Sequence, residues 1–228
     1  MPTDTPTRDQ ILDAAEQLFA RQGFAATTIK QIGAAAGVNS ALLYYYFDDK
    51  ETLYRAMLRR IMSGFVAIGT KLLAHAASPE QGIRTLVGLQ AEVMATRPHV
   101  PRLIARELVD HEAAHAEQEI ARLAASTFKT LCELIEHGQR AGLFRRDLVP
   151  QFAAISIVSQ VVYFNIARPA VGILLGYGPR GVPPETARAF ADHAADFAIA
   201  AITEHEPARR GRARNRSGGT SAGRLKKR

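Results

Sequence analysis

Residues 27–47, which read TTIKQIGAAAGVNSALLYYYF, decide the fold of this chain. A threonine at the start, apolar residues at helical spacing and Gly37 at the end predict one short helix. A second short helix, Ser40–Tyr46, follows after a brief gap. Two short helices joined by a tight glycine-containing turn are typical of a helix-turn-helix, whose second helix enters the major groove of DNA.

Small and apolar residues of this stretch predict how its two helices pack. Gly33 allows a close approach, Gly37 supplies the turn, and Val38 anchors the turn in the core. Leu43 and Phe47 are expected to face inward, where Phe47 contributes to core packing. The remaining positions of the second helix are then left for a partner.

Polar residues of the second helix offer donors to DNA. Asn39 and Ser40 at its start can reach base edges or phosphate, and the run Tyr44–Tyr46 carries phenolic hydroxyls. Charge gives little support, because residues 1–55 hold five basic and seven acidic side chains. The order of the motifs therefore carries the interpretation.

The flanking sequence predicts further helices. AAEQLFARQGF precedes the stretch and has apolar residues at helical spacing until Gly23. Asp48 and Glu51 form a capping box that starts a long helix from Lys50 toward Ala76. Helical periodicity then recurs to a last helix over 184–204, without strand alternation. We expect an all-α protein with about nine or ten helices.

The bulk composition fits a soluble helical protein. The chain has 228 residues, of which 47% are hydrophobic and 22% charged. The start, MPTDTPTRDQ, lacks the apolar region of a signal peptide. The longest apolar stretch, Phe152–Leu175, contains polar residues and a proline, which favours a buried or interface helix over a membrane span. Cys132 is alone and is expected in the core. We expect a cytoplasmic location and no membrane partner.

The positive charge belongs to the end of the chain. Residues 207–228 hold nine Arg and Lys and no acid, whereas the rest of the chain holds 20 basic and 22 acidic residues. This polar, Gly/Ser-rich segment is predicted to be a disordered basic tail. Such a tail either stays solvated and inert or adds nonspecific phosphate contacts.

The order of these segments resembles the TetR family of transcriptional regulators. AAEQLFARQGF, TTIKQIGAAAGV and LLYYYFDDKETLYRAML follow one another between Thr7 and about Leu58. The resemblance implies an N-terminal three-helix DNA-binding domain with a helix-turn-helix over residues 1–55. It also implies a helical ligand-binding and dimerisation domain over residues 56–206.

The resemblance also implies roles for single residues. Thr28 and Lys50 would hold phosphates, and Tyr45 would touch the phosphate strand. Leu42 departs from a frequent threonine or serine, so a phosphate hydrogen bond there is replaced by a possible contact with a thymine methyl. The residues implied to lie near bases or DNA backbone are Lys30, Asn39, Ser40, Ala41 and Tyr44.

An effector cavity needs apolar walls and a few polar groups. The candidate wall residues are Met94, Phe128, Phe152, Tyr163 and Phe164. The candidate orienting residues are His99, Arg102, Gln160 and Asn165. The apolar positions are also those of an ordinary core, and the two amides within an apolar helix can equally meet a second subunit.

The resemblance implies a repressor that binds a near-palindromic operator in double-stranded DNA as a homodimer. The helices over 152–168 and 184–204 would form the dimer surface as a four-helix bundle. A small-molecule effector would release the DNA by favouring another spacing of the two recognition helices. No cofactor is implied.

Residues 111–115, HEAAH, spell the zinc-protease signature. The alternative function is therefore a zinc-dependent hydrolase using His111, Glu112 and His115, with a third ligand from Glu133, Glu136 or His137. We expect instead that these are solvated helix-start residues and that no metal site is present. A regulatory metal or effector site remains open, and a helical adaptor for another protein is a further alternative.

Overall fold

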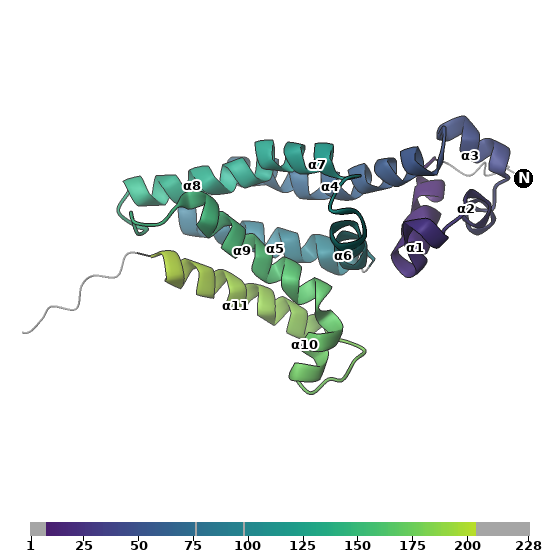
Figure 1. Ribbon diagram of the computed structural model, residues 1–228. Coiled ribbons are helices and arrows are strands. Elements are labelled where there is room, and N and C mark those ends of the chain that lie inside the picture. Colours follow the sequence, from purple (N-terminus) through teal and green to yellow (C-terminus); the bar gives the residue numbers. More distant parts are fainter. Residues whose placement is uncertain (1–7, 76, 98, 204–228) are drawn as a thin grey trace, which may run out of the picture.

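Helices form nearly all the regular structure of the computed structural model, which describes residues 8–75, 77–97 and 99–203 (Figure 1). The first four are α1 (Arg8–Ala26), α2 (Ile29–Ala36), α3 (Ser40–Tyr46) and α4 (Lys50–His75). The next four elements are α5 (Pro79–Thr96), α6 (Val100–His111), α7 (Glu117–Leu123) and a π-helical turn, Ala124–Phe128. The last are α8 (Lys129–Arg140), α9 (Pro150–Ile166), α10 (Arg168–Leu174) and α11 (Pro184–Ile202).

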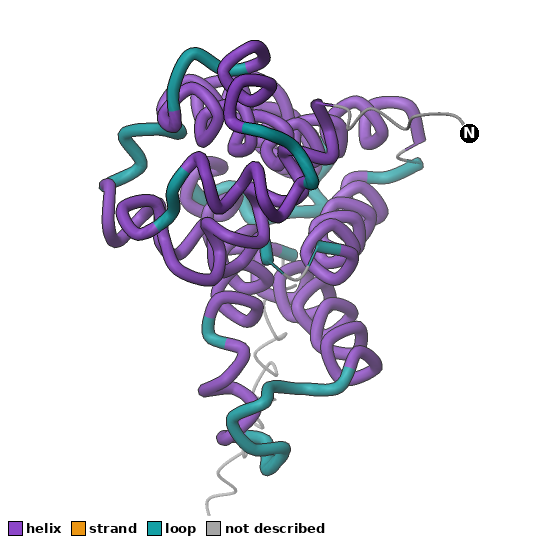
Figure 2. The backbone as a smooth tube through the Cα atoms, turned by 90° about the vertical axis from the view of Figure 1, so that its right-hand side faces the viewer, coloured by secondary structure: helices purple, strands orange, loops and turns teal. Residues whose placement is uncertain are grey.

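The predicted all-α class is confirmed, since the described residues contain no strand (Figure 2). An isolated antiparallel bridge joins Phe144 to Thr203. No single described helix is long and apolar enough to cross a membrane; α9 and α10 pass that test only together, and they are bent by 82°. The predicted basic tail, residues 207–228, lies outside the described residues.

Helices α1, α2 and α3 gather at one end of the molecule (Figure 1). Ile11 and Phe19 of α1, Ile32 of α2 and Leu43 of α3 are at most 1% exposed. These side chains form one hydrophobic core, whose burial removes apolar surface from water. The inward orientation predicted for Leu43 and Phe47 is confirmed.

The helix-turn-helix forms as the sequence predicts. Thr28 caps α2: its hydroxyl accepts from the Gln31 amide, and the Gln31 side chain accepts from the Thr28 amide. Gly37 ends α2 in the left-handed region, at φ 70°. A Cβ on Gly33 would lie 2.9 Å from the Val38 carbonyl oxygen. The close approach predicted at Gly33 is thus confirmed.

Helix α4 leaves this end and runs through the rest of the molecule (Figure 1). The predicted capping box of Asp48 and Glu51 is wrong: Asp49 accepts the hydrogen bond from the Thr52 amide, at 2.6 Å. The reason is that α4 begins at Lys50, which makes Asp49 the residue directly before its first turn. The helix also crosses the predicted domain boundary at residue 55, so both parts share it.

The C-terminal part packs helices on both sides of α5. Helix α5 contacts α4, α8, α9 and α11. In Figure 1, α11 runs beside α5 and α9, and α10 turns away at the far end of α9. A π-helical turn, Ala124–Phe128, lies between α7 and α8. There the Thr127 hydroxyl donates to the Phe65 carbonyl of α4 at 2.7 Å.

Candidate DNA-binding surface and ligand cavity

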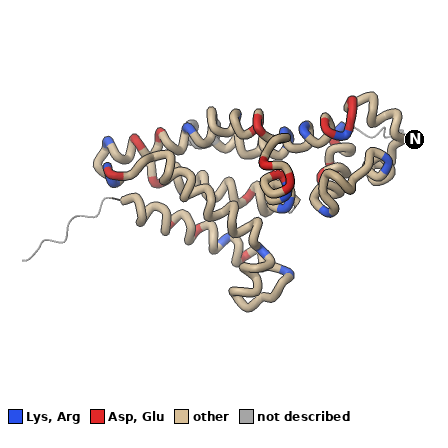
Figure 3. The backbone as a smooth tube through the Cα atoms, in the orientation of Figure 1, with Lys and Arg blue, Asp and Glu red and all other residues tan. Residues whose placement is uncertain are grey.

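The outer face of α3 presents uncharged side chains to solvent. Tyr44 is 56% exposed and Tyr45 is 80% exposed, although large aromatic residues are usually covered. Ala41 is exposed, and Ser40 and Leu42 are half-buried. Figure 3 shows no charged residue along α3. This face offers hydroxyl and apolar groups, and any charge must come from neighbouring elements.

Residues beside α3 complete this surface. Asn39 precedes α3 and uses its side-chain oxygen to accept from the Leu42 amide at 2.9 Å. The NH2 group of the Asn39 side chain takes no part in that bond. Thr28 and Lys30 at the start of α2 are exposed. The N-terminus of a capped helix presents backbone N–H groups that suit a phosphate.

Lys50 lies in the first turn of α4, but its amine is directed into the protein. Its Nζ donates to the Phe24 carbonyl at 3.0 Å and to the Thr27 carbonyl at 3.1 Å. The same Nζ lies 4.3 Å from the centre of the Phe24 ring. The structure therefore gives Lys50 a role in holding the end of α1 and the start of α2.

A cavity of about 180 Å³ lies inside the C-terminal part. Its walls come from α4, α5, α6, α7, α9 and the turn after α6. The wall is apolar except for Gln90 and Glu107. An apolar cavity with few polar groups is what a small-molecule site requires.

Gln90 is 4% exposed and incompletely satisfied. Its Nε2 donates to the Val158 carbonyl at 3.3 Å, whereas its Oε1 has no hydrogen-bond partner among the described residues. Gln90 lines both the larger cavity and a smaller one of about 70 Å³. A buried oxygen without a donor is costly, so this atom is suited to receive a donor from a ligand or water.

Most of the effector residues predicted from sequence lie away from the larger cavity. Met94 lines it, and Phe128 lines the smaller one. Tyr163 is 68% exposed, and Phe164 is stacked on Phe190 with ring centres 4.0 Å apart. The residues that line neither cavity are His99, Arg102, Phe152, Gln160, Tyr163, Phe164 and Asn165.

The side-chain amides of Gln160 and Asn165 stay on their own helix. Gln160 donates to the Ser156 carbonyl and Asn165 to the Val161 carbonyl, each four residues earlier. The exposed Phe152 belongs to the same outer face of α9 as Tyr163. The spacing of apolar residues in the sequence could not show which face of α9 is inward, because nearly all of its residues are apolar.

The candidate DNA-binding end, formed by α1, α2 and α3, meets the C-terminal part where α6 packs on α1 and a side-chain hydrogen bond joins α6 to α4. There the Tyr54 hydroxyl donates to Glu107 Oε2 at 3.1 Å. Burial, followed by the neighbouring Glu107 carboxylate, raises the pKa of Tyr54 well above its ordinary value, so the phenol keeps its proton. Since Glu107 also lines the cavity, one carboxylate touches both the cavity and the DNA-binding end.

A buried ion-pair network joins the same two parts. Glu16 of α1 accepts from Arg60 of α4 at 3.2 Å and also from Arg97. Its side chain is 8% exposed. Glu16, Tyr54, Gln90 and Glu107 were not identified from sequence as functional residues. The sequence offers one signal for these residues, which is their position on the core-facing side of a helix, because a polar residue buried there needs a partner.

The HEAAH segment is not the solvated helix start that was expected. Helix α6 ends at His111, and Glu112 and Ala113 follow with φ values of 51° and 66°. His111 and His115 are half-buried, with ring centres 5.7 and 5.3 Å from that of Phe24. The turn folds back because the Ala113 amide donates to the Glu107 carbonyl at 3.0 Å.

This geometry removes the zinc-protease alternative. A zinc protease needs both imidazoles on one continuous helix with the glutamate beside the metal, whereas here the helix ends between them and Glu112 is exposed. Glu133 and Glu136 pair with Lys129 and Arg140 on α8, so neither joins the histidines.

Two family models match the chain. Residues 11–57 match the bacterial regulatory proteins of the tetR family, and residues 79–197 match a tetracyclin repressor-like C-terminal domain. The HTH-type transcriptional repressor NicS of Pseudomonas putida is 35% identical over 164 residues, covering 71% of this chain and 77% of that protein. The chain belongs to the TetR family.

Other relatives and solved structures agree. The repressor KstR2 of Rhodococcus jostii is 29% identical over 147 residues, covering 64% of this TetR-family chain and 72% of that protein. FadR from Bacillus subtilis, solved with stearoyl-CoA, has the same fold, with a TM-score of 0.69 at 16% identity over 86% of this chain and all of that one. This TetR-family protein is a DNA-binding transcriptional regulator and not an enzyme.

Proposed function

We propose that this regulator is a homodimeric repressor that binds a near-palindromic operator and releases it when a small molecule fills the cavity. The exposed, uncharged face of α3 is the single observation that carries the proposal. In a helix-turn-helix this face enters the major groove, where hydroxyl and methyl contacts read base edges. In this proposal Ser40, Ala41, Leu42 and Tyr44 contact bases, and Thr28, Lys30, Asn39 and Tyr45 contact the DNA backbone.

Lys50 takes a different part in this proposal. Its bonds to Phe24 and Thr27 fix the approach to α2, so it supports DNA binding by positioning the start of that helix. A direct phosphate contact from Lys50 would require its amine to leave two carbonyl partners.

A homodimer is supported by the outer faces of α9 and α11. Phe152, Ile155 and Tyr163 are each more than half exposed and lie on one stripe of α9. Phe197 of the neighbouring α11 is 60% exposed. Large apolar residues gathered on adjacent helices are typical of a subunit interface, and two copies would form a four-helix bundle.

The effector proposal follows from the cavity and from Glu107. A ligand that touches Glu107 would disturb the hydrogen bond between the Glu107 carboxylate and the Tyr54 hydroxyl. Tyr54 belongs to α4, the helix that leads to the DNA-binding end. Binding in the cavity would thereby favour one placement of that end over another. In its present size the cavity suits a compact apolar ligand, since about 150 Å³ is enough for benzene.

The first test selects genomic DNA fragments on the purified chain and washes them at increasing salt. We expect a near-palindromic motif that survives high salt, because base contacts persist where phosphate contacts are screened. Tyr44→Ala should lose the motif, whereas Tyr177→Ala, a change of a half-exposed tyrosine far from α3, should keep it. The proposal would be contradicted if the full chain retained DNA fragments without a common motif and a chain lacking residues 207–228 retained none.

The ligand proposal has a matched pair of probes in phenol and toluene, which have similar shape and differ by one hydroxyl. Phenol should raise the melting temperature more than toluene, because its hydroxyl can donate to the unpartnered Gln90 Oε1. Gln90→Leu should remove that preference. Equal effects of the two probes on the wild-type chain would argue against Gln90 as the orienting residue.

A further inference from the structure

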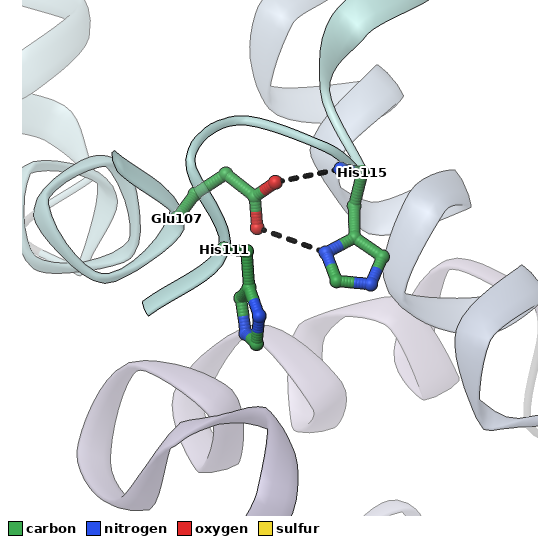
Figure 4. Close-up of side chains that lie close together, drawn as sticks. All are labelled: Glu107, His111 and His115. Atoms are coloured by element: carbon green, nitrogen blue, oxygen red, sulfur yellow. Dashed lines mark hydrogen bonds and ion pairs between the residues drawn. The ribbon is translucent and has the colours of Figure 1, made fainter. Parts of the chain in front are cut away.

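The turn after α6 brings together three groups with the chemistry of metal ligands, and the proposed function uses only one of them. Glu107, His111 and His115 each place one ligand atom within 4.8 Å of the others. Within the part of the chain that the structure describes, this is the only such group of His, Cys, Asp or Glu. Figure 4 shows the Glu107 carboxylate beside His115, with the His111 ring close by.

The carboxylate of Glu107 is already oriented. The backbone N–H of His115 donates to Oε1 at 2.8 Å, and the His115 ring Nδ1 lies 3.3 Å from Oε2. The Glu107 side chain is 5% exposed and that of His115 is 14% exposed. Hydrogen bonds of this kind hold ligating carboxylates in metal sites.

This buried carboxylate lacks a permanent cation. Among the described residues, its only ion-pair partner is the His115 ring, which is charged only when protonated. The nearby Arg106 pairs instead with Asp110, at 3.6 Å. Buried carboxylates are as a rule paired with a cation or bound to a metal, so the charge of the site favours a cation between Glu107 and the histidines.

We propose that Glu107, His111 and His115 bind a divalent transition-metal ion of the Zn²⁺ type. Two imidazole nitrogens and one carboxylate oxygen are a ligand set for such ions, and a tetrahedral site would leave the fourth position to water. The ligand atoms of a tetrahedral Zn²⁺ site lie about 3.3 Å apart, so the side chains must close from their present spacing. The partly exposed histidine rings leave room for that movement.

The metal would compete with the contact between the two parts of the molecule. Oε1 can keep the His115 amide, whereas a metal on Oε2 would share that oxygen with the Tyr54 hydroxyl and weaken its hydrogen bond by withdrawing charge from the carboxylate. Metal binding would thus act on the same carboxylate as a cavity ligand and lower operator affinity. This second step rests on the proposed function, whereas the metal site itself does not.

Metal binding is tested on the full chain after chelator treatment, by calorimetric titration with Zn²⁺ and by the visible spectrum with Co²⁺. We expect one ion per chain, and affinity at least about tenfold weaker in His111→Asn and in His115→Asn. His137→Asn changes an exposed histidine on α8 and should bind as the wild type does. Circular dichroism of each variant shows whether it is folded.

Absence of Zn²⁺ binding by the wild-type chain, or unchanged binding by both histidine variants, would overturn the site. Glu107→Gln is a weaker test because it also disturbs Tyr54. The histidine variants keep both partners of the Tyr54–Glu107 hydrogen bond. They remove rings whose centres lie 6.2 Å (His111) and 5.2 Å (His115) from that of Tyr54, which is why the fold of each variant is checked.

The coupling is tested with the selected operator, in Zn²⁺ and in chelator. Zn²⁺ should weaken wild-type binding about tenfold, within the range of ordinary allosteric coupling, and should not affect the chain carrying both His111→Asn and His115→Asn. If bound Zn²⁺ left the operator affinity unchanged, the proposed coupling would be overturned. Failure to find any operator would overturn the proposed function and leave the calorimetric result standing.

Discussion

A lysine amine near a helix start can meet a phosphate or hold backbone carbonyls, and Lys50 does the second. Its Nζ bonds to Phe24 and Thr27 and lies over the Phe24 ring. The sequence places the lysine at the right turn of α4 but does not show where the amine points. That direction depends on the end of α1, where Gly23, at φ 83°, turns the chain before Phe24.

Lys50→Met should destabilise the fold by about 1–3 kcal/mol, because two charge-assisted hydrogen bonds are lost. Lys30→Met removes the same charge from an exposed position and should change the unfolding free energy by less than about 0.5 kcal/mol. Urea denaturation measures both. If the two variants were equally stable, the hydrogen bonds from Lys50 to the two carbonyls would contribute nothing to the stability of the fold.

Gly33 is a second position at which one substitution should change the stability of the fold. Gly33→Ala places a methyl group 2.9 Å from the Val38 carbonyl oxygen and 3.0 Å from Leu43 Cδ1. We expect a loss of about 1–3 kcal/mol, as for other overpacked sites, measured by thermal unfolding.

Gly88→Ala is the matched control, because no atom of the residues that the structure describes lies within 4 Å of the added Cβ on α5. It should stabilise the chain by up to about 1 kcal/mol through helix propensity. A Gly33→Ala chain as stable as Gly88→Ala would mean that α2 and α3 can move apart freely.

Among the elements, short helices with clear caps were predictable and their partners were not. The limits of α2 and α3 follow from Thr28, Gly37 and Asn39, whose capping bonds are local. The inward face of α9 was not predictable because its apolar residues surround the helix. The cavity likewise depends on five helices meeting, so the sequence identified Met94 but not Gln90 or Glu107.

The contact between α4 and α6 carries a pH signature. Burial raises the pKa of Tyr54 above its ordinary 10.0, so the unfolded chain loses this proton at a lower pH than the folded one. Stability from the protonated phenol is present in full below pH 10.0 and is lost as the pH rises further.

Tyr54→Phe should therefore be less stable by about 1–3 kcal/mol at neutral pH, because Glu107 loses a buried donor. Above pH 10.0 its unfolding free energy should fall less steeply than that of the wild type. Chemical denaturation across this pH range provides the measurement, with the exposed Tyr45→Phe expected to follow the wild type. If the unfolding free energies of Tyr54→Phe and of the wild type fell in parallel above pH 10.0, the raised pKa of Tyr54 would be contradicted.

At the scale of the whole molecule, the exposed stripe on α9 predicts the oligomeric state. Tyr163→Glu places a charge in the middle of that apolar face and should convert the proposed dimer into a monomer, as measured by sedimentation equilibrium without DNA. Tyr45→Glu, at the similarly exposed tyrosine on α3, should leave the mass unchanged. A dimeric Tyr163→Glu chain would place the interface elsewhere.

Helix α4 joins cavity and DNA-binding end without a break, and its length has a geometric consequence. Its 26 residues span about 39 Å, so a tilt of about 5° around its far end carries Lys50 through about 3 Å. In a two-fold pair the two recognition helices would then separate by up to about 7 Å. Successive major grooves lie about 34 Å apart, so a rotation too small to disturb the core is enough to take both helices out of register with the DNA.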